Sequence, residues 1–384
     1  MILMSLMSVS SRSMWSQRSL TEWIRRGILI QQRALLRLSC GSGGVGGALA
    51  PPVDCGVTAE QAVNVWTQCF QQHGISEPLL SSHYIIAHVL GKKTLQSVER
   101  RRLKERLTDK ETEKVWVLCS KRLMRMPVQY VIEEWDFRDL TLKMRPPVFI
   151  PRPETEELVS LVLKDLRSQW GMRTLRCLEV GCGSGAISLS LLHSVPQGRK
   201  PGYPGETPKA PGGHATSTHT GQRQKSNPIP ELKAFALDQS QEAVCLTKEN
   251  AGRLGLLDRL DVYHLDIIKD ADLTLRSCSP VDVLVSNPPY LFSQDMESLQ
   301  AEILRFEDHS ALDGGLDGMS VIRQILTLAP RLLTDGGRMY LEIDPRHPPL
   351  IKCLVEESIP GLQYLGSHCD YTNRLRFCIL QKSR

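Results

Sequence analysis

Apolar segments that alternate with helical segments, from residue 174 to the end of the chain, are the feature that most constrains the fold. Buried strands are predicted at residues 175–180, 234–237, 260–264, 281–286 and 338–343. Two further segments, 362–366 and 374–380, predict an antiparallel pair. Strands that alternate with helices favour a doubly wound, mostly parallel sheet. We therefore predict an α/β fold whose sheet lies within a domain of residues 151–384.

Residues 58–125 predict a small helical domain in front of this sheet. Their apolar residues recur at helical spacing, and Gly74 and Gly91 stand where helices should end. We interpret this domain as the part of the chain that recognises a substrate. Residues 126–150, including the segment 128–132, alternate enough to predict a β-hairpin that links the two domains. Thr155, or the turn before it, would cap a helix that begins near Glu156.

Two segments have compositions that do not favour a packed core. Residues 1–50 contain six arginines and one acidic residue, and therefore carry the whole net charge of +5. This Ser- and Arg-rich composition is typical of a mitochondrial transit peptide followed by a linker, and it predicts a protein of the mitochondrial matrix. Residues 197–231 contain six glycines and six prolines, and they predict a disordered insertion.

The charge and the cysteines limit the classes of protein that fit the chain. Because the chain beyond residue 50 is close to neutral, a strongly basic nucleic-acid-binding protein is disfavoured. The apolar runs of the leader are too short for a transmembrane helix. The eleven cysteines include no Cys-x-x-Cys pair, so the sequence supports no metal site. We expect a monomer that binds neither a membrane nor nucleic acid stably.

The motif most informative about function, Asn287-Pro288-Pro289-Tyr290, follows the strand predicted at residues 281–286. Its prolines restrict φ and remove two backbone N–H donors. The acceptors that remain are the side-chain carbonyl of Asn287 and the backbone carbonyls. Such a site accepts hydrogen bonds from a planar NH2 group, which the aromatic face of Tyr290 can hold by stacking. The motif predicts an enzyme that acts on an amide or amino nitrogen, with catalytic candidates Asn287, Pro288, Pro289 and Tyr290.

A glycine-rich loop follows the strand predicted at residues 175–180 and precedes an apolar helix. Its form, acidic-x-Gly-x-Gly-x-Gly, differs from the dinucleotide pattern and resembles the S-adenosylmethionine loop of class I methyltransferases. Asp238 and Asp266 come at the ends of the next two strands, where they are placed to bind ribose hydroxyls and an adenine amino group. The candidate cofactor-binding residues are Glu179, Gly181, Cys182, Gly183, Ser184, Gly185, Asp238, Asp266, Ile267 and Asn287.

Three motifs behind a helical domain, at residues 152–156, 179–185 and 287–290, together resemble the HemK/PrmC family. Members of this family are protein-(glutamine-N5) methyltransferases of translational release factors. The resemblance covers roughly residues 58–384 without the insertion, and the Arg-rich leader points to the mitochondrial member. It implies that S-adenosyl-L-methionine is the cofactor. It also implies that the partner is a mitochondrial peptide chain release factor, methylated on the glutamine of its Gly-Gly-Gln motif.

The resemblance further implies a role for each catalytic candidate. The Asn287 side-chain oxygen and the Pro288 carbonyl would accept the two hydrogens of the glutamine amide, and Tyr290 would pack against the glutamine side chain. Two residues depart from the family pattern, since Glu133 and Asp344 stand where the family usually has glycine. Glycine permits backbone angles that Glu133 adopts less readily, so this departure could alter the hairpin near the substrate cleft.

For several charged residues near these motifs, the sequence is consistent with two roles each. Glu154 and Glu156 could line the cofactor pocket, although helix capping and packing are favoured. Arg152 could pair with an acid near the site or form an ordinary surface pair. Glu342, on the strand predicted at residues 338–343, could orient the catalytic loop or only satisfy local backbone donors.

Two other functions also fit parts of the sequence. The Asn-Pro-Pro-Tyr motif also serves enzymes that methylate the exocyclic amine of adenine or guanine in DNA or RNA. Residues 58–125 carry twelve Lys or Arg and seven Asp or Glu, an excess of basic residues that suits RNA and an acidic protein surface equally. A non-catalytic binding protein is the third possibility, which the intact motifs disfavour.

Overall fold

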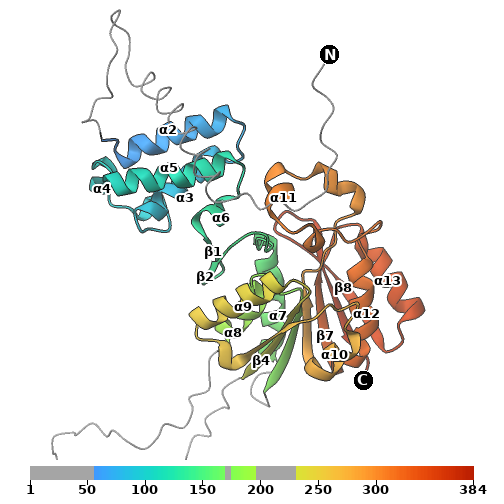
Figure 1. Cartoon of the computed structure of the whole chain (residues 1–384). Coiled ribbons are helices and arrows are strands. Elements are labelled where there is room, and N and C mark those ends of the chain that lie inside the picture. Colours follow the sequence, from blue (N-terminus) through green and yellow to red (C-terminus); the bar gives the residue numbers. More distant parts are fainter. Residues whose placement is uncertain (1–55, 169–173, 196–230) are drawn as a thin grey trace, which may run out of the picture. The chain divides into compact units, whose positions relative to one another are not determined.

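The computed structural model describes residues 56–168, 174–195 and 231–384, which form two compact units (Figure 1). The first unit ends at Ile132, and the second begins at Glu133. The predicted transit peptide and its linker lie outside the described residues. So does the predicted insertion, apart from Glu231. None of the described helices is long and apolar enough to cross a membrane.

The first unit is helical, as predicted, and its helices enclose a core of their own. This core includes Trp66, Phe70, Ile85 and Ile86, all of which are buried. Thr58 and Thr108 each begin a helix with a capping box, in which the threonine side chain and the third residue of the helix bond to each other's backbone N–H groups. The elements are α2 Ala59–Gln72, α3 Pro78–Val89, η1 Leu95–Ser97, α4 Arg100–Lys104, α5 Asp109–Leu123 and α6 Val128–Ile132.

The prediction of a hairpin over residues 126–150 is wrong at its beginning. Val128–Ile132 forms helix α6, and its Val131 and Ile132 belong to the core of the helical unit. Alternation over five residues did not distinguish a strand from one helical turn, because both bury the apolar members of so short a segment. The hairpin itself is shorter, and consists of β1 Glu134–Phe137 paired antiparallel with β2 Leu140–Lys143.

The second unit is a doubly wound sheet, which confirms the predicted fold class. The strand order is β5-β4-β3-β6-β7-β9-β8, and β9 runs antiparallel to both of its neighbours. The remaining pairs from β5 to β7 are parallel. The strands are β3 Leu175–Val180, β4 Leu232–Asp238, β5 Leu260–His264, β6 Val281–Ser286, β7 Leu333–Glu342, β8 Leu362–Cys369 and β9 Leu375–Lys382.

Three of the predicted strands have the bounds that the structure shows, and the others differ at their ends. The largest difference is at β7, which begins at Leu333 rather than at residue 338. Leu333 pairs with Val281, and the register between β6 and β7 then shifts before Arg338 pairs with Val283. The residues between, Thr334 to Gly337, are turn formers, which hid this irregular stretch from the sequence pattern.

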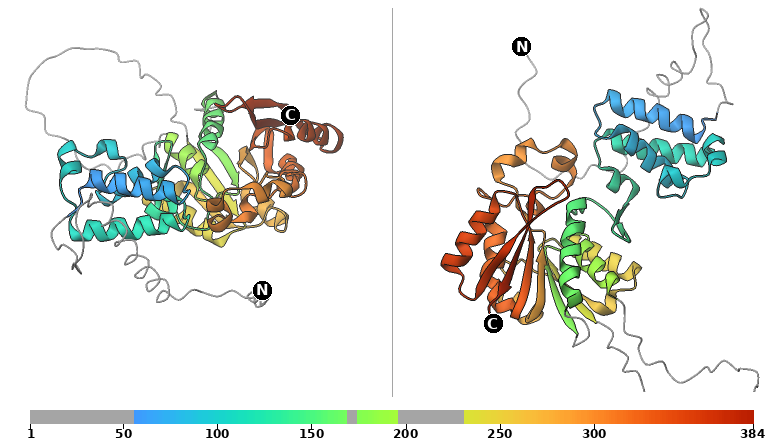
Figure 2. Two further views of the ribbon diagram at one scale, coloured as in Figure 1. Left: turned by 90° about the horizontal axis from the view of Figure 1, so that it is seen from above. Right: turned by 180° about the vertical axis from the view of Figure 1, so that it is seen from behind.

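Helices cover both faces of the sheet (Figure 2). On one face lie α7 Pro153–Ser168, α8 Ala186–Ser194 and α9 Gln241–Arg253, and on the other lie α10 Ala271–Cys278, α12 Ser320–Leu332 and α13 His347–Ser358. The loops of this unit contain short helical elements. Between α9 and β5 lies η2 Leu257–Arg259, and between β6 and α12 lie η3 Ser293–Ser298, α11 Ala301–Phe306 and η4 His309–Ala311. The main core packs α10, α12 and α13 against the sheet through residues such as Leu275, Ile322, Ile351 and Leu341.

Residues 196–230, which lie outside the described residues, join α8 to β4 in the sequence. Helix α8 ends at Ser194, and β4 begins at Leu232. In a parallel sheet, helix-to-strand connections lie at the amino ends of the strands, whereas ligands bind beyond their carboxyl ends. The junction of the predicted insertion is therefore at the end of the sheet opposite the ligand crevice.

Candidate active site

The carboxyl ends of β3, β4, β5 and β6 bring most of the predicted site residues around one cavity, whereas Gly185 and Tyr290 are not among the residues that line it. Strand β3 lies between β4 and β6, so the chain order changes direction there, and such a switch point leaves a crevice for ligands. The cavity is lined by parts of the glycine loop, by the ends of β4 and β5, and by the Asn-Pro-Pro segment. Among its lining residues are Glu179, Gly181, Cys182, Gly183, Ser184, Asp238, Asp266, Ile267, Asn287, Pro288 and Pro289.

The glycine loop is a tight turn whose backbone is held by neighbouring elements. The N–H groups of Gly181 and Cys182 both donate to the carbonyl of Leu237, at 2.8 and 3.1 Å. Thr247 and Asn250, on α9, donate to the carbonyls of Gly183 and Ser184, each at 3.0 Å. These bonds fix the loop before any ligand binds, which lowers the entropy that binding has to remove.

Gly185 is required by the geometry of the turn into α8. Its φ is +83°, and an added Cβ would lie 2.9 Å from Leu189 and 3.0 Å from Thr247. A Cβ at Gly183, by contrast, would meet no atom within 4 Å, so the cavity is open beside this glycine. The loop thus combines a packed end with an open one, as expected of backbone that a ligand approaches closely.

Glu179, which was predicted to bind the cofactor, holds the loop to the following helix. Its side chain is buried, and Oε2 accepts a hydrogen bond of 2.9 Å from the N–H of Ser188 in the first turn of α8. Burial raises the pKa of Glu179 to about 8, although the hydrogen bonds from Ser188 oppose this shift. Glu179 lines the cavity, but its first observed role is to order the glycine turn.

Asp238 is the acid best placed to bind a ribose. It ends β4, and its two oxygens each accept one backbone hydrogen bond of 2.9 Å, from Gly183 and from Ser240. Burial raises the pKa of Asp238, and these two bonds oppose the shift. Since each carboxylate oxygen has a further lone pair, the side chain can still accept two hydroxyl hydrogens.

Asp266 is more fully engaged by its own loop than the sequence suggested. Oδ1 accepts from the N–H of Ile268 at 2.9 Å and from that of Lys269, and Oδ2 pairs with the Lys269 ammonium at 3.0 Å. Although burial opposes it, these contacts lower the pKa of Asp266. Ile267 is buried and lines the cavity, where it can contact a flat apolar group.

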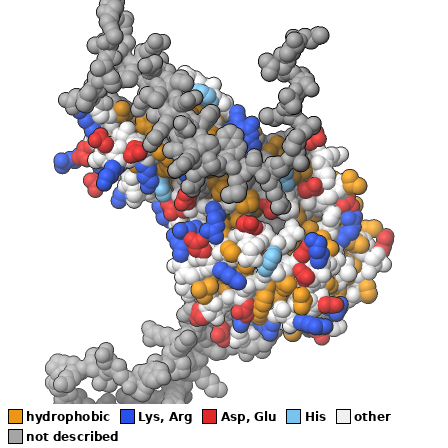
Figure 3. Space-filling model, in the orientation of Figure 1, with side chains coloured by type: hydrophobic (Ala, Val, Ile, Leu, Met, Phe, Trp, Pro, Cys, Tyr) orange, Lys and Arg blue, Asp and Glu red, His pale blue; other side chains and the backbone are white. Residues whose placement is uncertain are grey.

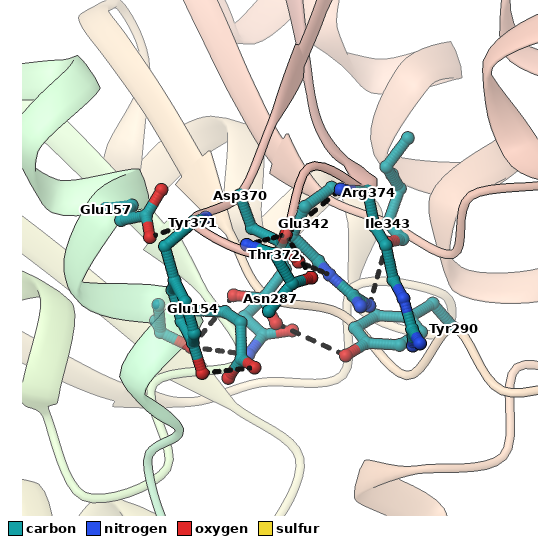
Figure 4. Close-up of polar contacts among 12 residues, drawn as sticks. Glu154, Glu157, Asn287, Tyr290, Glu342, Ile343, Asp370, Tyr371, Thr372 and Arg374 are labelled. Carbon is teal, nitrogen blue, oxygen red and sulfur yellow. Dashed lines mark hydrogen bonds and ion pairs between the residues drawn. The ribbon is translucent and has the colours of Figure 1, made fainter.

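The buried carboxylate of Glu342 is linked by hydrogen bonds to both ends of the Asn-Pro-Pro-Tyr segment (Figure 4). The Nδ2 of Asn287 donates to the Thr155 hydroxyl at 3.2 Å, and that hydroxyl donates to Oε2 of Glu342 at 2.8 Å. The Tyr290 hydroxyl donates to Oε1 of the same glutamate at 3.2 Å. Glu342 therefore holds the Asn-Pro-Pro-Tyr segment through Thr155 and Tyr290, and the role of orienting this loop was one of its two predicted roles.

The prediction that Thr155 caps the helix near Glu156 is wrong. Helix α7 begins at Pro153, so Thr155 lies inside its first turn and does not cap it. The hydroxyl of Thr155 points instead to Asn287 and Glu342. Pro153 provides the signal for the true start, because proline is favoured at the first position of a helix.

The neighbouring charged residues hold segments around the site. Arg152 pairs at 2.7 Å with Glu307, which is buried and also accepts from the N–H of Ile150 at 3.1 Å. Glu156 accepts from the backbone of Arg138 in the β1–β2 turn, at 3.0 Å, so it anchors the hairpin.

Glu154 holds the turn between β8 and β9. Its Oε1 accepts from the Tyr371 hydroxyl at 3.2 Å, while the backbone N–H of Tyr371 donates to Glu157 at 3.0 Å (Figure 4). These contacts fit the packing part of the favoured interpretation of Glu154 and Glu156, and both residues lie in the first turn of α7.

Both departures from the family pattern have visible structural consequences. Glu133 has a φ of +62°, in the left-handed region that glycine adopts most readily, so a side chain here carries a strain of about 1–2 kcal/mol. Asp344 pairs with Arg346 at 2.7 Å, and Arg346 also pairs with Asp295 at 2.7 Å and lies over the Phe292 ring. Asp344 thus helps to anchor the segment that follows Tyr290.

The loop 313–318 packs directly against the end of the Asn-Pro-Pro-Tyr segment. The N–H of Gly314 donates to the carbonyl of Leu291 at 2.8 Å, and the N–H of Leu291 donates to the carbonyl of Leu312 at 3.0 Å. Gly318 has a φ of +68°, and an added Cβ would overlap the carbonyl oxygen of Tyr290 and the ring of His347. The position of Tyr290 therefore depends on the absence of a side chain at Gly318.

We predict that Gly318→Ala lowers both stability and kcat. The left-handed φ alone costs about 1–2 kcal/mol, and the overlap adds a displacement of Tyr290. Gly361→Ala is the matched control, because Gly361 has a φ of +84° but an added Cβ there meets nothing within 4 Å. Urea unfolding should show a loss for both variants, while kcat per folded molecule should fall only for Gly318→Ala. Equal kcat values for the two variants would contradict this account of the loop.

An open, mostly parallel sheet whose switch point presents a glycine loop, a carboxylate at the end of β4 and an Asn-Pro-Pro-Tyr segment is the architecture of a class I methyltransferase that uses S-adenosylmethionine. Residues 61–132 match the PrmC N-terminal domain, and residues 181–305 match the RMKL-like methyltransferase domain. The human MTRF1L release factor glutamine methyltransferase is 43% identical over 87% of this chain and 90% of its own length. The chain therefore belongs to the release factor glutamine methyltransferase family, which confirms the resemblance seen in its motifs.

More distant relatives carry the same description. The release factor glutamine methyltransferase of Gloeobacter violaceus is 31% identical over 65% of this chain and 73% of its own length. Among solved structures, the 16S rRNA N2 G1207 methyltransferase of Thermus thermophilus gives a TM-score of 0.39 at 16% identity, covering 65% of this chain and 50% of that one. The likeness to that structure is too distant to carry an argument about substrate.

Proposed function

We propose that this enzyme methylates the side-chain amide nitrogen of the glutamine in the Gly-Gly-Gln motif of a mitochondrial release factor. The observation that carries the proposal is the orientation of Asn287. Because its Nδ2 is bound to Thr155, its Oδ1 is the atom left to accept hydrogen from a substrate NH2 group. The human relative is described as a release factor glutamine methyltransferase, which supports a protein amide as the source of that group.

The residues of the site act by positioning. An amide nitrogen is a poor nucleophile, because its lone pair is delocalised into the carbonyl. Oδ1 of Asn287 and the backbone carbonyl of Pro288 would accept its two hydrogens and hold the nitrogen in one orientation, with Tyr290 packed against the glutamine stem. Positioning and fixed dipoles of this kind account for much of the rate enhancement of many enzymes.

The cavity fits S-adenosylmethionine, which supplies an activated methyl group when bound. Asp238 would accept the ribose hydroxyls, and the open backbone at Gly181 and Gly183 would accommodate the amino acid part. Ile267 would contact the adenine, while Asp266 keeps less capacity to accept its amino hydrogens because Lys269 and two N–H groups already occupy the carboxylate.

The main alternative is methylation of an exocyclic amine in RNA or DNA. On the face seen in Figure 3, acidic and basic side chains are interspersed on the described residues that grey atoms leave visible. Continuous positive charge is the usual requirement for binding a nucleic acid backbone. The relatives that are described as release factor glutamine methyltransferases support a protein substrate instead.

A labelled-methyl assay tests the substrate. The enzyme would be incubated with methyl-labelled S-adenosylmethionine, a purified mitochondrial release factor and total mitochondrial RNA in one reaction. We expect label in the release factor and its loss when the Gly-Gly-Gln glutamine is replaced by alanine. Label that appears in the RNA and not in the protein would favour the nucleic-acid alternative.

We also propose that the enzyme works in the mitochondrial matrix as a monomer, with its helical unit helping to recognise the release factor. The composition of residues 1–50 supports the location. A fluorescent protein fused behind these residues should be imported into mitochondria. A diffuse cytosolic signal would contradict the proposed location.

A further inference from the structure

A chain of hydrogen bonds joins Asn287 to a buried carboxylate that does not itself reach the cavity. Glu342 is the last residue of β7 and is 1% exposed, and Thr155 on α7 is 3% exposed. Thr155 lies between Glu342 and Asn287, at 2.8 Å from the former and 3.2 Å from the latter. Among the residues that line the cavity are Thr155 and Asn287.

The protonation state of Glu342 determines which atoms donate and which accept along these hydrogen bonds. A hydroxyl group has one proton to donate, and an ionised carboxylate can only accept. When Glu342 is ionised, Thr155 gives its proton to Oε2, so the Thr155 oxygen can act only as an acceptor toward Asn287. The amide of Asn287 then turns its NH2 group to Thr155 and its Oδ1 away from it, in the orientation that a substrate NH2 group requires.

Protonation of Glu342 removes this constraint. A neutral carboxyl group can donate its own proton to the Thr155 oxygen, which frees the Thr155 proton for Oδ1 of Asn287. The Asn287 amide could then turn over, and its NH2 group would face the NH2 group of the substrate. Two donors that face each other form no hydrogen bond, so the substrate nitrogen would lose its positioning.

The groups around Glu342 favour a carboxylate that changes charge near neutral pH. Burial raises the pKa of Glu342 to about 7, while the hydroxyls of Thr155 and Tyr290 and the charge of Arg376 oppose the shift. Glu154, on α7, adds a further increase through its negative charge. Arg376, on β9, pairs with Asp370 at 3.2 Å, which reduces its capacity to neutralise Glu342.

We propose that Glu342 is a positioning residue which, through the Thr155 hydroxyl, fixes the direction of the Asn287 amide, so that protonation of Glu342 switches methylation off. The inference rests on the proposed function, because it assigns Oδ1 of Asn287 to the substrate amide. Glu342 takes no part in the chemical step and transfers no proton to the substrate. Its effect is on kcat and on the pH dependence of kcat.

The test measures kcat against pH for the full-length enzyme and five variants, with S-adenosylmethionine affinity measured in parallel by calorimetry. The wild type should lose activity below an apparent pKa of about 7, because Glu342 becomes protonated. Glu342→Gln should lower the plateau of kcat by about 10- to 100-fold and remove this acid limb, since misorientation of a positioning group has effects of that order. The Kd for S-adenosylmethionine should change by less than about two-fold, because Asp238 and the glycine loop are untouched.

Two substitutions at Thr155 separate the hydroxyl from the packing. Thr155→Ser keeps a hydroxyl group and should retain kcat within about two-fold, whereas the isosteric Thr155→Val removes the acceptor and should lower kcat by about ten-fold or more. Equal activity of the serine and valine variants would overturn the proposal. This pair keeps the test decisive if Glu342→Gln fails to fold.

Tyr290→Phe provides a directional test. The ring is kept, but the hydroxyl that stabilises ionised Glu342 is lost, so the pKa of Glu342 should rise and the acid limb should move to higher pH. An unchanged limb in this variant, or the same limb in Glu342→Gln, would overturn the proposal.

Asn287→Ala in the same series distinguishes the inference from the function on which it rests. If the wild type methylates the release factor and Asn287→Ala does not, the proposed function stands whatever Glu342→Gln does. In that case, wild-type activity and pH dependence in Glu342→Gln would overturn only the role of Glu342. If the wild type leaves the release factor unmodified, both proposals fail.

Discussion

Replacing Asn287 by alanine should lower kcat for methylation by about 10²–10³-fold. The loss of one preorganised hydrogen-bonding group at a reacting centre has effects of this size in other enzymes. The backbone of the segment should remain in place, because the bonds between Leu291, Leu312 and Gly314 do not involve the Asn287 side chain. S-adenosylmethionine binding should therefore change only a few-fold, and steady-state kinetics with calorimetry measure the two quantities separately.

Asn64→Ala is the matched control for this substitution. Asn64 is exposed on α2, so its loss should leave kcat unchanged. An Asn287→Ala enzyme with wild-type kcat would remove Asn287 from the catalytic group. The Asn-Pro-Pro-Tyr motif would then act only as a rigid turn.

Replacing Asp238 by alanine should weaken S-adenosylmethionine binding by about 10²–10⁴-fold. Hydrogen bonds to a charged group contribute about 1.5–3 kcal/mol each, and the variant loses the two that the ribose would donate. It also loses the anchors that hold the N–H groups of Gly183 and Ser240. Calorimetric titration of the purified enzyme measures the change directly.

Asp258→Ala supplies the comparison for Asp238→Ala. Asp258 is an exposed aspartate in η2, immediately before β5 and therefore at the amino ends of the strands. The Kd of this variant should equal that of the wild type. A similar loss of affinity in both variants would indicate a general effect of charge or stability, and would contradict a specific role for Asp238.

The sheet could be predicted from the sequence because each strand carries its own local signal. Runs such as Val281–Ser286 are buried along their whole length and end in recognisable turns or motifs. The same local signals failed for Val128–Ile132, which is too short for its period to be decisive, and at Leu333, where turn-forming residues interrupt the strand. These failures all concern the ends of elements or very short elements.

The site could be predicted only in part, because its motifs were recognisable but their mutual contacts were not. The glycine loop, Asp238 and the Asn-Pro-Pro-Tyr segment each follow a strand, so the rules for parallel sheets place them together. The contact between Thr155 and Glu342 joins residues 187 positions apart, and that between Arg152 and Glu307 joins residues 155 positions apart. Such pairs follow from tertiary packing, which no local pattern encodes.

The contacts of Asp266 also could not be predicted from its position in the sequence. Its place after β5 correctly predicted that it would line the cavity. The pairing of its carboxylate with Lys269, three residues further on, leaves less of it available to a ligand. Position in the sheet therefore predicted which residues surround the cavity better than it predicted what each side chain does there.

Tandem mass spectrometry of a mitochondrial release factor, after incubation with this enzyme and S-adenosylmethionine, tests the central claim most directly. We predict a single added methyl group on the side-chain amide of the Gly-Gly-Gln glutamine, absent when Asn287→Ala replaces the wild type. A release factor that remains unmodified while the enzyme demonstrably binds S-adenosylmethionine, or a methyl group on any other residue, would contradict the proposed function.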